Sequence, residues 1–146
     1  NTSICPTSTF DAQHIRIKAR KPSGSLSLLK NFAEVFYMLK HEFGIMPKAP
    51  KPGKRYDKYE PQKYDCISVD DAYLQEVTDR LIAIDFYWHT LSVRGRGLAY
   101  CGITLIPPDS LKVFADVVTD IPQLRELAEL LKKAARESKW VIHFGI

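Results

Sequence analysis

The hydrophobic positions of this 146-residue chain follow two periods, one typical of strands and one typical of helices. Residues 14–20, HIRIKAR, place Ile15 and Ile17 on one side and basic residues on the other, which predicts a strand at a sheet edge. Residues 25–43 carry apolar side chains three and four positions apart, which predicts a helix that Gly44 closes. Residues 1–13, which precede both, are polar and predict a loose segment.

Two shorter apolar runs predict further strands. Residues 65–69, DCISV, form the first of them, and the last strand lies within residues 139–146, KWVIHFGI. In that final run, period two places Trp140, Ile142 and Phe144 on one face.

Three helices are predicted downstream of residue 67. Ser68 and Asp71 have the spacing of a capping box, and we interpret Asp71 as a capping carboxylate of the helix that follows. The other two helices lie within residues 107–118 and 120–138, the first with two prolines and the second with one proline near its start. The predicted buried stripes are Leu74, Val77, Leu81 and Ile84; Leu111, Phe114, Val117 and Val118; and Leu124, Leu127, Leu131 and Ala134.

Residues 46–64 interrupt these patterns. They contain four prolines, six basic residues and three tyrosines, so neither a helix nor a strand should persist there. A loop of this length inside a compact domain is usually functional or disordered.

Residues 86–106 predict a central β-hairpin. Gly95-Arg96 between two apolar runs predicts a two-residue turn, which would pair Trp88 with Ile103. In that register, Cys101 and His89 point to opposite faces, which excludes a Cys–His dyad and favours a small buried apolar role for Cys101.

These elements predict an α+β fold over residues 1–146. We expect a single domain with a mixed, mostly antiparallel sheet packed against about four helices. No apolar run is long enough to cross a bilayer, and we expect no secretory signal at the start.

Charge and cysteine content add two expectations. Residues 1–63 carry 12 Lys/Arg against 5 Asp/Glu, so the basic character lies in the N-terminal part. Three cysteines with no CxxC spacing favour a reducing cytoplasm over a disulfide scaffold, and no cofactor or metal site is predicted.

The candidate catalytic residues centre on His89, which should face Gly102 and leave space above the strand. If the final strand lies beside the hairpin, His143 could approach His89 and form a group suited to acid–base chemistry. The full candidate set is His89, His143, Asp85, Tyr87 and Tyr100. The simpler interpretation of His89 is a half-buried, hydrogen-bonded structural histidine.

The candidate binding residues are basic or aromatic. They are Arg16, Lys18, Arg20, Lys54, Arg55, Tyr56, Arg94 and Arg96. Because no compact catalytic motif is present, the sequence favours a non-catalytic domain that binds another macromolecule, namely a protein. One alternative is nucleic-acid binding through the basic strand and residues 46–64, where lysines alternate with tyrosines. Another is a small hydrolase or transferase built on the His89 face. The sequence does not indicate an oligomeric state.

Overall fold

A computed structural model describes residues 39–146, and in this range the chain forms one antiparallel sheet. The sheet has six strands in the order β2-β1-β6-β5-β3-β4. Their bounds are Lys40–Ile45 (β1), Ile67–Asp70 (β2), Asp85–Trp88 (β3), Arg94–Arg96 (β4), Ile103–Ile106 (β5) and Val141–Phe144 (β6). The α+β class is confirmed. The predicted strand 14–20 and the segment 1–13 lie outside the described residues.

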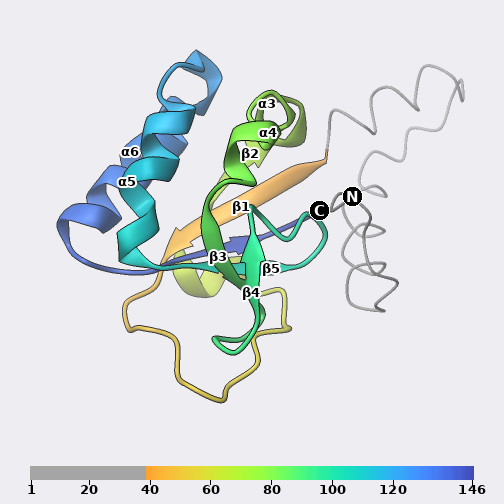
Figure 1. Cartoon of the computed structure of the whole chain (residues 1–146), viewed down its shortest axis with the longest axis vertical. Helices are drawn as coiled ribbons and strands as arrows, with labels where there is room; N and C mark the ends of the chain where they lie inside the picture. Colours follow the sequence, from red (N-terminus) through yellow and green to blue (C-terminus); the bar gives the residue numbers. More distant parts are fainter. Residues whose placement is uncertain (1–38) are drawn as a thin grey trace, which may run out of the picture.

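Helices cover one face of this sheet (Figure 1). They are α3 (Asp71–Gln75), α4 (Thr78–Leu81), α5 (Pro108–Val118) and α6 (Arg125–Arg136), with 3-10 turns η1 (Pro61–Tyr64) and η2 (Pro122–Leu124). The stripe predicted for residues 120–138 is fully buried, and so are Leu111, Phe114 and Val118 of α5. The helix expected after Ser68 is instead two short helices, but its four predicted apolar residues are buried.

The core on the helix face holds the rings of Phe43, Phe86 and Phe114. The Phe114 ring lies 6.0 Å from Phe43 and 5.6 Å from Phe86, measured between centroids. All three side chains are fully buried, and burial of one such side chain contributes about 1.5–3 kcal/mol. The helix face is therefore a continuous apolar layer that fixes the sheet beneath it.

The long segment 46–64 covers the opposite face (Figure 1). Apart from η1 it is irregular, as its prolines predict. Its Tyr56, Tyr59 and Tyr64 pack against a buried cluster that includes Ile142 and Phe144. Because both faces are covered, every residue of the central strands β5 and β6 is buried. The predicted shared face of Trp140, Ile142 and Phe144 is confirmed.

The helix predicted over residues 25–43 is wrong at its C-terminal end, because residues 40–43 belong to strand β1. Leu39 precedes this strand and is not helical, and residues 25–38 lie outside the described residues. Gly44 lies within the strand and does not end a helix. A Cβ at Gly44 would lie 2.7 Å from Cys66 Sγ and 2.7 Å from the Tyr64 carbonyl oxygen. Glycine is therefore needed here because the chain around residues 64–66 approaches the strand closely.

The turn predicted at Gly95-Arg96 is also wrong. These residues form strand β4, in which Gly95 pairs with Phe86, and the chain reverses over residues 89–93. Trp88 explains the difference: its indole lies over Gly95, and its Nε1 donates to the Gly97 carbonyl oxygen at 2.9 Å. The glycine thus makes room for a ring and does not form a turn.

The register between β3 and β5 differs from the prediction by one residue, because Trp88 pairs with Thr104 and not with Ile103. A slip of one residue moves every side chain to the other face. Tyr87 accordingly shares a face with Leu105. None of the helices within residues 39–146 is long and apolar enough to span a membrane.

Candidate functional site

A buried polar cluster lies between the sheet and the helices. Strands β1, β6 and β5 are neighbours, and they place His41, His143 and Thr104 side by side on the helix face. Asp71, the first residue of α3, reaches this row from above. None of the four side chains is more than 1% exposed. Buried polar groups are costly unless they are paired, so their contacts decide what the cluster does.

The cluster is a continuous chain of hydrogen bonds. His41 Nε2 lies 2.9 Å from Asp71 Oδ1, His41 Nδ1 lies 2.8 Å from His143 Nε2, and His143 Nδ1 lies 3.0 Å from Thr104 Oγ1. The backbone amide of Ala99 donates to the same threonine oxygen at 2.8 Å. These contacts occupy both nitrogens of each ring.

The partners at the two ends assign the direction of these bonds. The Asp71 carboxylate can only accept, so His41 donates to it from Nε2 and accepts from His143 at Nδ1. His143 then accepts the Thr104 hydroxyl proton at its own Nδ1. In this arrangement both histidines are neutral and every ring nitrogen has a hydrogen-bond partner. If His41 took up a proton, its positive charge would lie beside the Asp71 carboxylate.

The second oxygen of Asp71 connects the cluster to the surface. Tyr100 donates to Asp71 Oδ2 at 2.6 Å, and Gln75 Nε2 donates to the same oxygen and to the Tyr100 hydroxyl, each at 3.0 Å. Burial opposes ionisation of Asp71, but hydrogen bonds from His41, Tyr100 and Gln75 lower the pKa of its carboxyl group below the ordinary value. Burial and the bond to Asp71 raise the pKa of Tyr100, which therefore stays a phenol.

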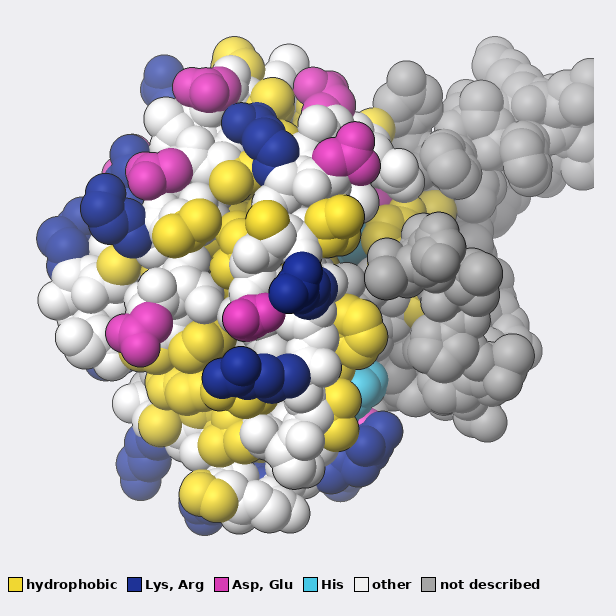
Figure 2. Space-filling view, viewed as in Figure 1, with side chains coloured by type: hydrophobic (Ala, Val, Ile, Leu, Met, Phe, Trp, Pro, Cys, Tyr) yellow, Lys and Arg dark blue, Asp and Glu magenta, His cyan; other side chains and the backbone are white. Residues whose placement is uncertain are grey.

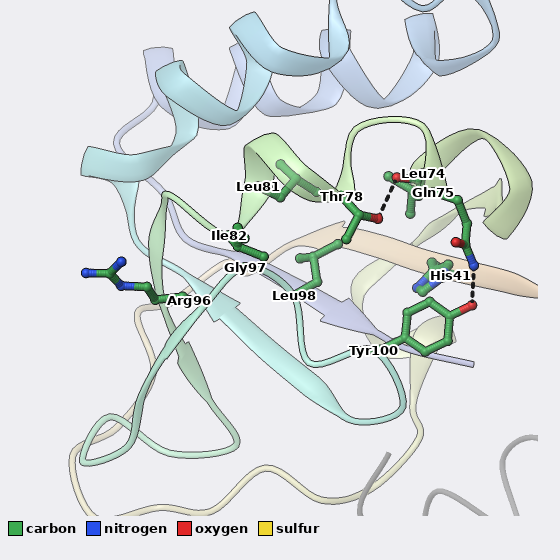
Figure 3. Close-up of a pocket in the computed structure, with 10 residues that line it drawn as sticks. All are labelled: His41, Leu74, Gln75, Thr78, Leu81, Ile82, Arg96, Gly97, Leu98 and Tyr100. Atoms are coloured by element: carbon green, nitrogen blue, oxygen red, sulfur yellow. Dashed lines mark hydrogen bonds between the residues drawn. The ribbon is translucent and has the colours of Figure 1, made fainter. Parts of the chain in front are cut away.

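These groups form the polar end of a pocket of about 180 Å³ (Figure 3). Its apolar wall is built from Leu74, Leu81, Ile82 and Leu98, and its polar end from His41, Gln75 and Tyr100. Arg96 lies at the opposite end and points away from the other lining residues in Figure 3. Among residues 39–146, no group of His, Cys, Asp and Glu side chains could hold a metal ion.

The five candidate catalytic residues do not form one site, because they lie on both faces of the sheet and beside its edge strand β4. His143 belongs to the buried cluster, and the half-buried Tyr100 is joined to that cluster through its hydrogen bond to Asp71. Asp85 is exposed and pairs with Arg96 at 3.8 Å, and the Tyr87 ring packs against Trp140 on the other face of the sheet.

His89 belongs to the layer formed by residues 46–64. Its Nδ1 lies 2.9 Å from the Tyr56 carbonyl oxygen and 2.9 Å from Asp57 Oδ1. His89 does face Gly102, but its ring fills the space that the glycine leaves, because a Cβ at Gly102 would lie 2.6 Å from His89 Nε2. His143 has different hydrogen-bond partners on the helix face, so no shared acid–base group forms with His89.

The candidate binding residues are also separated. Arg16, Lys18 and Arg20 lie outside the described residues. Lys54, Arg55 and Tyr56 lie in the segment over the sheet, and Arg94 and Arg96 are exposed on β4.

Three residues of the cluster, His41, Asp71 and Thr104, are absent from the sequence-based candidates. His41 lies in the stretch interpreted as helix, although period two in residues 39–43 was the available signal. The capping interpretation of Asp71 is wrong: Asp70 is the N-cap of α3, and Asp71 is buried against His41.

The interpretation of the cysteines needs a correction as well. Cys101 is buried as expected, but it is disulfide-bonded. Cys66 is a free thiol, and burial is the main factor that raises its pKa to about 12.

Comparison with known proteins adds no candidate function, because no family model, no curated protein and no solved structure matches this chain.

Proposed function

We propose that this chain is a non-catalytic protein-interaction domain that holds one apolar side chain of a protein partner in the pocket beside α3 and α4. The volume of the pocket, about 180 Å³, carries this proposal. Sites for small molecules usually enclose about 300–1,000 Å³, whereas protein interfaces are often anchored by single buried side chains that fill smaller pockets.

The polar end of the pocket supports the same proposal. Tyr100 and Gln75 are held by Asp71, which is in turn fixed by the buried histidines. Polar groups that are already ordered lose little entropy when a partner binds, so they favour affinity. A tyrosine or phenylalanine side chain fits this combination of an apolar wall and a polar end.

The occupied ring nitrogens argue against acid–base catalysis in this pocket. A general base needs a nitrogen or oxygen within hydrogen-bond reach of the substrate. Both nitrogens of His41 are directed to Asp71 and His143, and both oxygens of Asp71 already accept hydrogen bonds. We therefore interpret the cluster as the support of a binding surface.

Nucleic-acid binding remains a prediction. The positive charge of residues 46–64 is partly neutralised within the segment, since Arg55 pairs with Asp57 at 2.6 Å and Lys63 with Glu60 at 3.8 Å. On the face drawn in Figure 2, basic and acidic side chains are interspersed among apolar ones. Binding to a single-stranded oligonucleotide at low and high salt tests this alternative, because phosphate contacts weaken steeply as salt rises.

The enzyme built on the His89 face and the cytoplasmic location also remain predictions. The disulfide at Cys101 weighs against the second of these, because disulfides are rare in reducing compartments.

The proposed pocket can be tested with side-chain analogues. We expect toluene and p-cresol to shift the NMR methyl signals of Leu74, Leu81 and Leu98 in a saturable way. The substitution Thr78→Arg places a long cation against the lining and should weaken both analogues by about tenfold or more.

The matched control is Val113→Arg, an exposed position on α5 that does not line the pocket. It should leave the affinity for both analogues unchanged. Shifts outside the pocket, or equal effects of the two substitutions, would contradict the proposal. A protein partner captured by the wild-type chain should be lost with Thr78→Arg and retained with Val113→Arg.

A further inference from the structure

A second pocket lies on the other face of the sheet, between residues 54–64 and strand β6. Its volume is about 360 Å³, within the range of small-molecule sites and twice that of the pocket beside α3. Its floor is formed by Ile142 and Phe144, which are no more than 1% exposed. Since the floor belongs to a central strand of the sheet, its position is fixed.

The rim of this pocket is positively charged. Four cations, Lys54, Arg55, Lys58 and Lys63, line it together with two carboxylates. Asp57 is shared between Arg55 and His89, with nitrogen–oxygen distances of 2.6 and 2.9 Å. Lys63 is 3.8 Å from Glu60, a long contact that an incoming anion can replace. Lys58 makes no ion pair with any described residue. Two positive charges therefore remain in excess where the pocket opens.

Two aromatic rings line the same pocket. Lys54 lies 4.8 Å from the centroid of Tyr56, and Lys63 lies 5.7 Å from the centroid of Tyr64. The Tyr64 ring also packs against Phe144 at 6.2 Å. A planar ring can therefore find a flat apolar surface within reach of a cation, an arrangement that suits a ligand with both features.

We propose that this pocket binds a small planar aromatic molecule that carries an anionic group, of the class of the nucleoside monophosphates. The ring lies against Tyr56 and Tyr64, whose side chains are half-buried, and the phosphate lies at Lys58 and Lys63. Neither part is sufficient alone: the apolar floor offers nothing to a bare anion, and exposed lysines attract anions only weakly once salt screens them. This inference is independent of the interaction pocket beside α3, which uses other residues.

The experiment compares three probes, AMP, adenosine and inorganic phosphate, by isothermal titration of the full chain. We expect AMP to bind saturably, and adenosine and phosphate to bind about tenfold or more weakly, because each lacks one half of the recognised chemistry. The double variant Lys58→Gln/Lys63→Gln should weaken AMP by about tenfold and reduce the salt dependence of its affinity.

Lys48→Gln is the matched control, because Lys48 is exposed in the same loop and does not line the pocket. It should change the affinity for AMP by less than about twofold. The proposal is overturned if AMP shows no saturable binding, if phosphate binds as well as AMP, or if Lys48→Gln and the double variant have equal effects. A single-stranded oligonucleotide that binds far more tightly than AMP would also overturn it, since the site would then belong to a strand and not to a free small molecule.

Discussion

The two faces of the sheet are covered in different ways. The helix face is apolar and regular, and the buried polar cluster described above is linked end to end by hydrogen bonds. The other face is covered by an irregular segment whose tyrosines combine an apolar ring with a hydroxyl. Tyr59 illustrates this, because its ring packs on Phe144 while its hydroxyl donates to Glu42 at 2.6 Å.

This difference predicts that the helix face contributes more to the stability of the fold, and that the segment 46–64 adjusts more easily. Breaking the helix face leaves polar groups unpaired in the core, which is among the most destabilising changes known for proteins. Most residues of the segment over the other face are exposed or half-buried, and such regions open at low cost. We therefore expect substitutions to cost more on the helix face and ligands to be accommodated more easily under the segment 46–64.

The largest effect should come from Asp71→Ala. The substitution removes the carboxylate and leaves donors of His41 and Tyr100 unpaired, so the free energy of unfolding should fall by about 2–6 kcal/mol, at about 1–3 kcal/mol for each donor. Urea unfolding followed by circular dichroism measures this loss. The control is the adjacent Asp70→Ala. Asp70 pairs with Lys40 at the surface, and although it is the N-cap of α3 its side chain makes no capping hydrogen bond, so the change should cost less than about 1 kcal/mol. Similar losses for the two substitutions would contradict a special role for the buried cluster.

The second largest loss of stability should come from Gly44→Ala, because the chain around residues 64–66 lies close to Gly44 on the other face of the sheet. Gly44→Ala introduces a Cβ against the Cys66 thiol and the Tyr64 carbonyl oxygen, and overpacking of this kind costs about 1–3 kcal/mol. Thermal unfolding measures the change. Adding Cys66→Ala removes the clash with sulfur but not the one with the backbone, so the double variant should recover only part of the stability. Complete recovery would show that the sulfur contact alone required the glycine.

The helix face is also the part that the sequence predicts best. The stripes of α5 and α6 repeat over several turns, so local periodicity and burial agree. Strand β1 shows where this fails: Leu39 and Phe43 are four apart, which fits a helix, while His41 and Phe43 are two apart, which fits a strand. The pairing of β1 with β2 and β6 makes this segment a strand. Because that pairing joins residues distant in sequence, the local pattern alone does not decide between helix and strand.

The polar cluster could not be assembled from the sequence for the same reason. His41 and His143 are 102 residues apart, and only the order of strands makes them neighbours. Asp71 carries a misleading local signal, since an acidic residue at the start of a helix is normally explained by capping. His89 is the opposite case: its proximity to Gly102 was predicted from a hairpin with the wrong turn, because the two strands still run side by side.

The smallest loss of stability is expected from Tyr59→Phe, which is compared with Tyr100→Phe on the helix face. Tyr59→Phe removes one hydrogen bond to Glu42 and keeps the ring on Phe144, so it should cost about 1 kcal/mol near neutral pH. Burial, and then the bond to Glu42, raise the pKa of Tyr59, so its contribution to stability is complete below the ordinary tyrosine pKa of about 10. Above that pH the unfolded chain loses the Tyr59 proton and the folded chain keeps it, so stability falls as pH rises.

In Tyr59→Phe this alkaline loss should be smaller than in the wild type, as measured by urea unfolding at pH values on both sides of 10. The loss that remains comes in part from Tyr100, whose pKa is raised by burial and by Asp71 on the helix face. The matched variant Tyr100→Phe keeps the Tyr59 contribution but leaves Asp71 Oδ2 without its phenol donor, so it should cost more at neutral pH than Tyr59→Phe. If Tyr59→Phe were the more destabilising substitution, the segment 46–64 would hold the fold together as firmly as the helices do, and the contrast between the two faces would be lost.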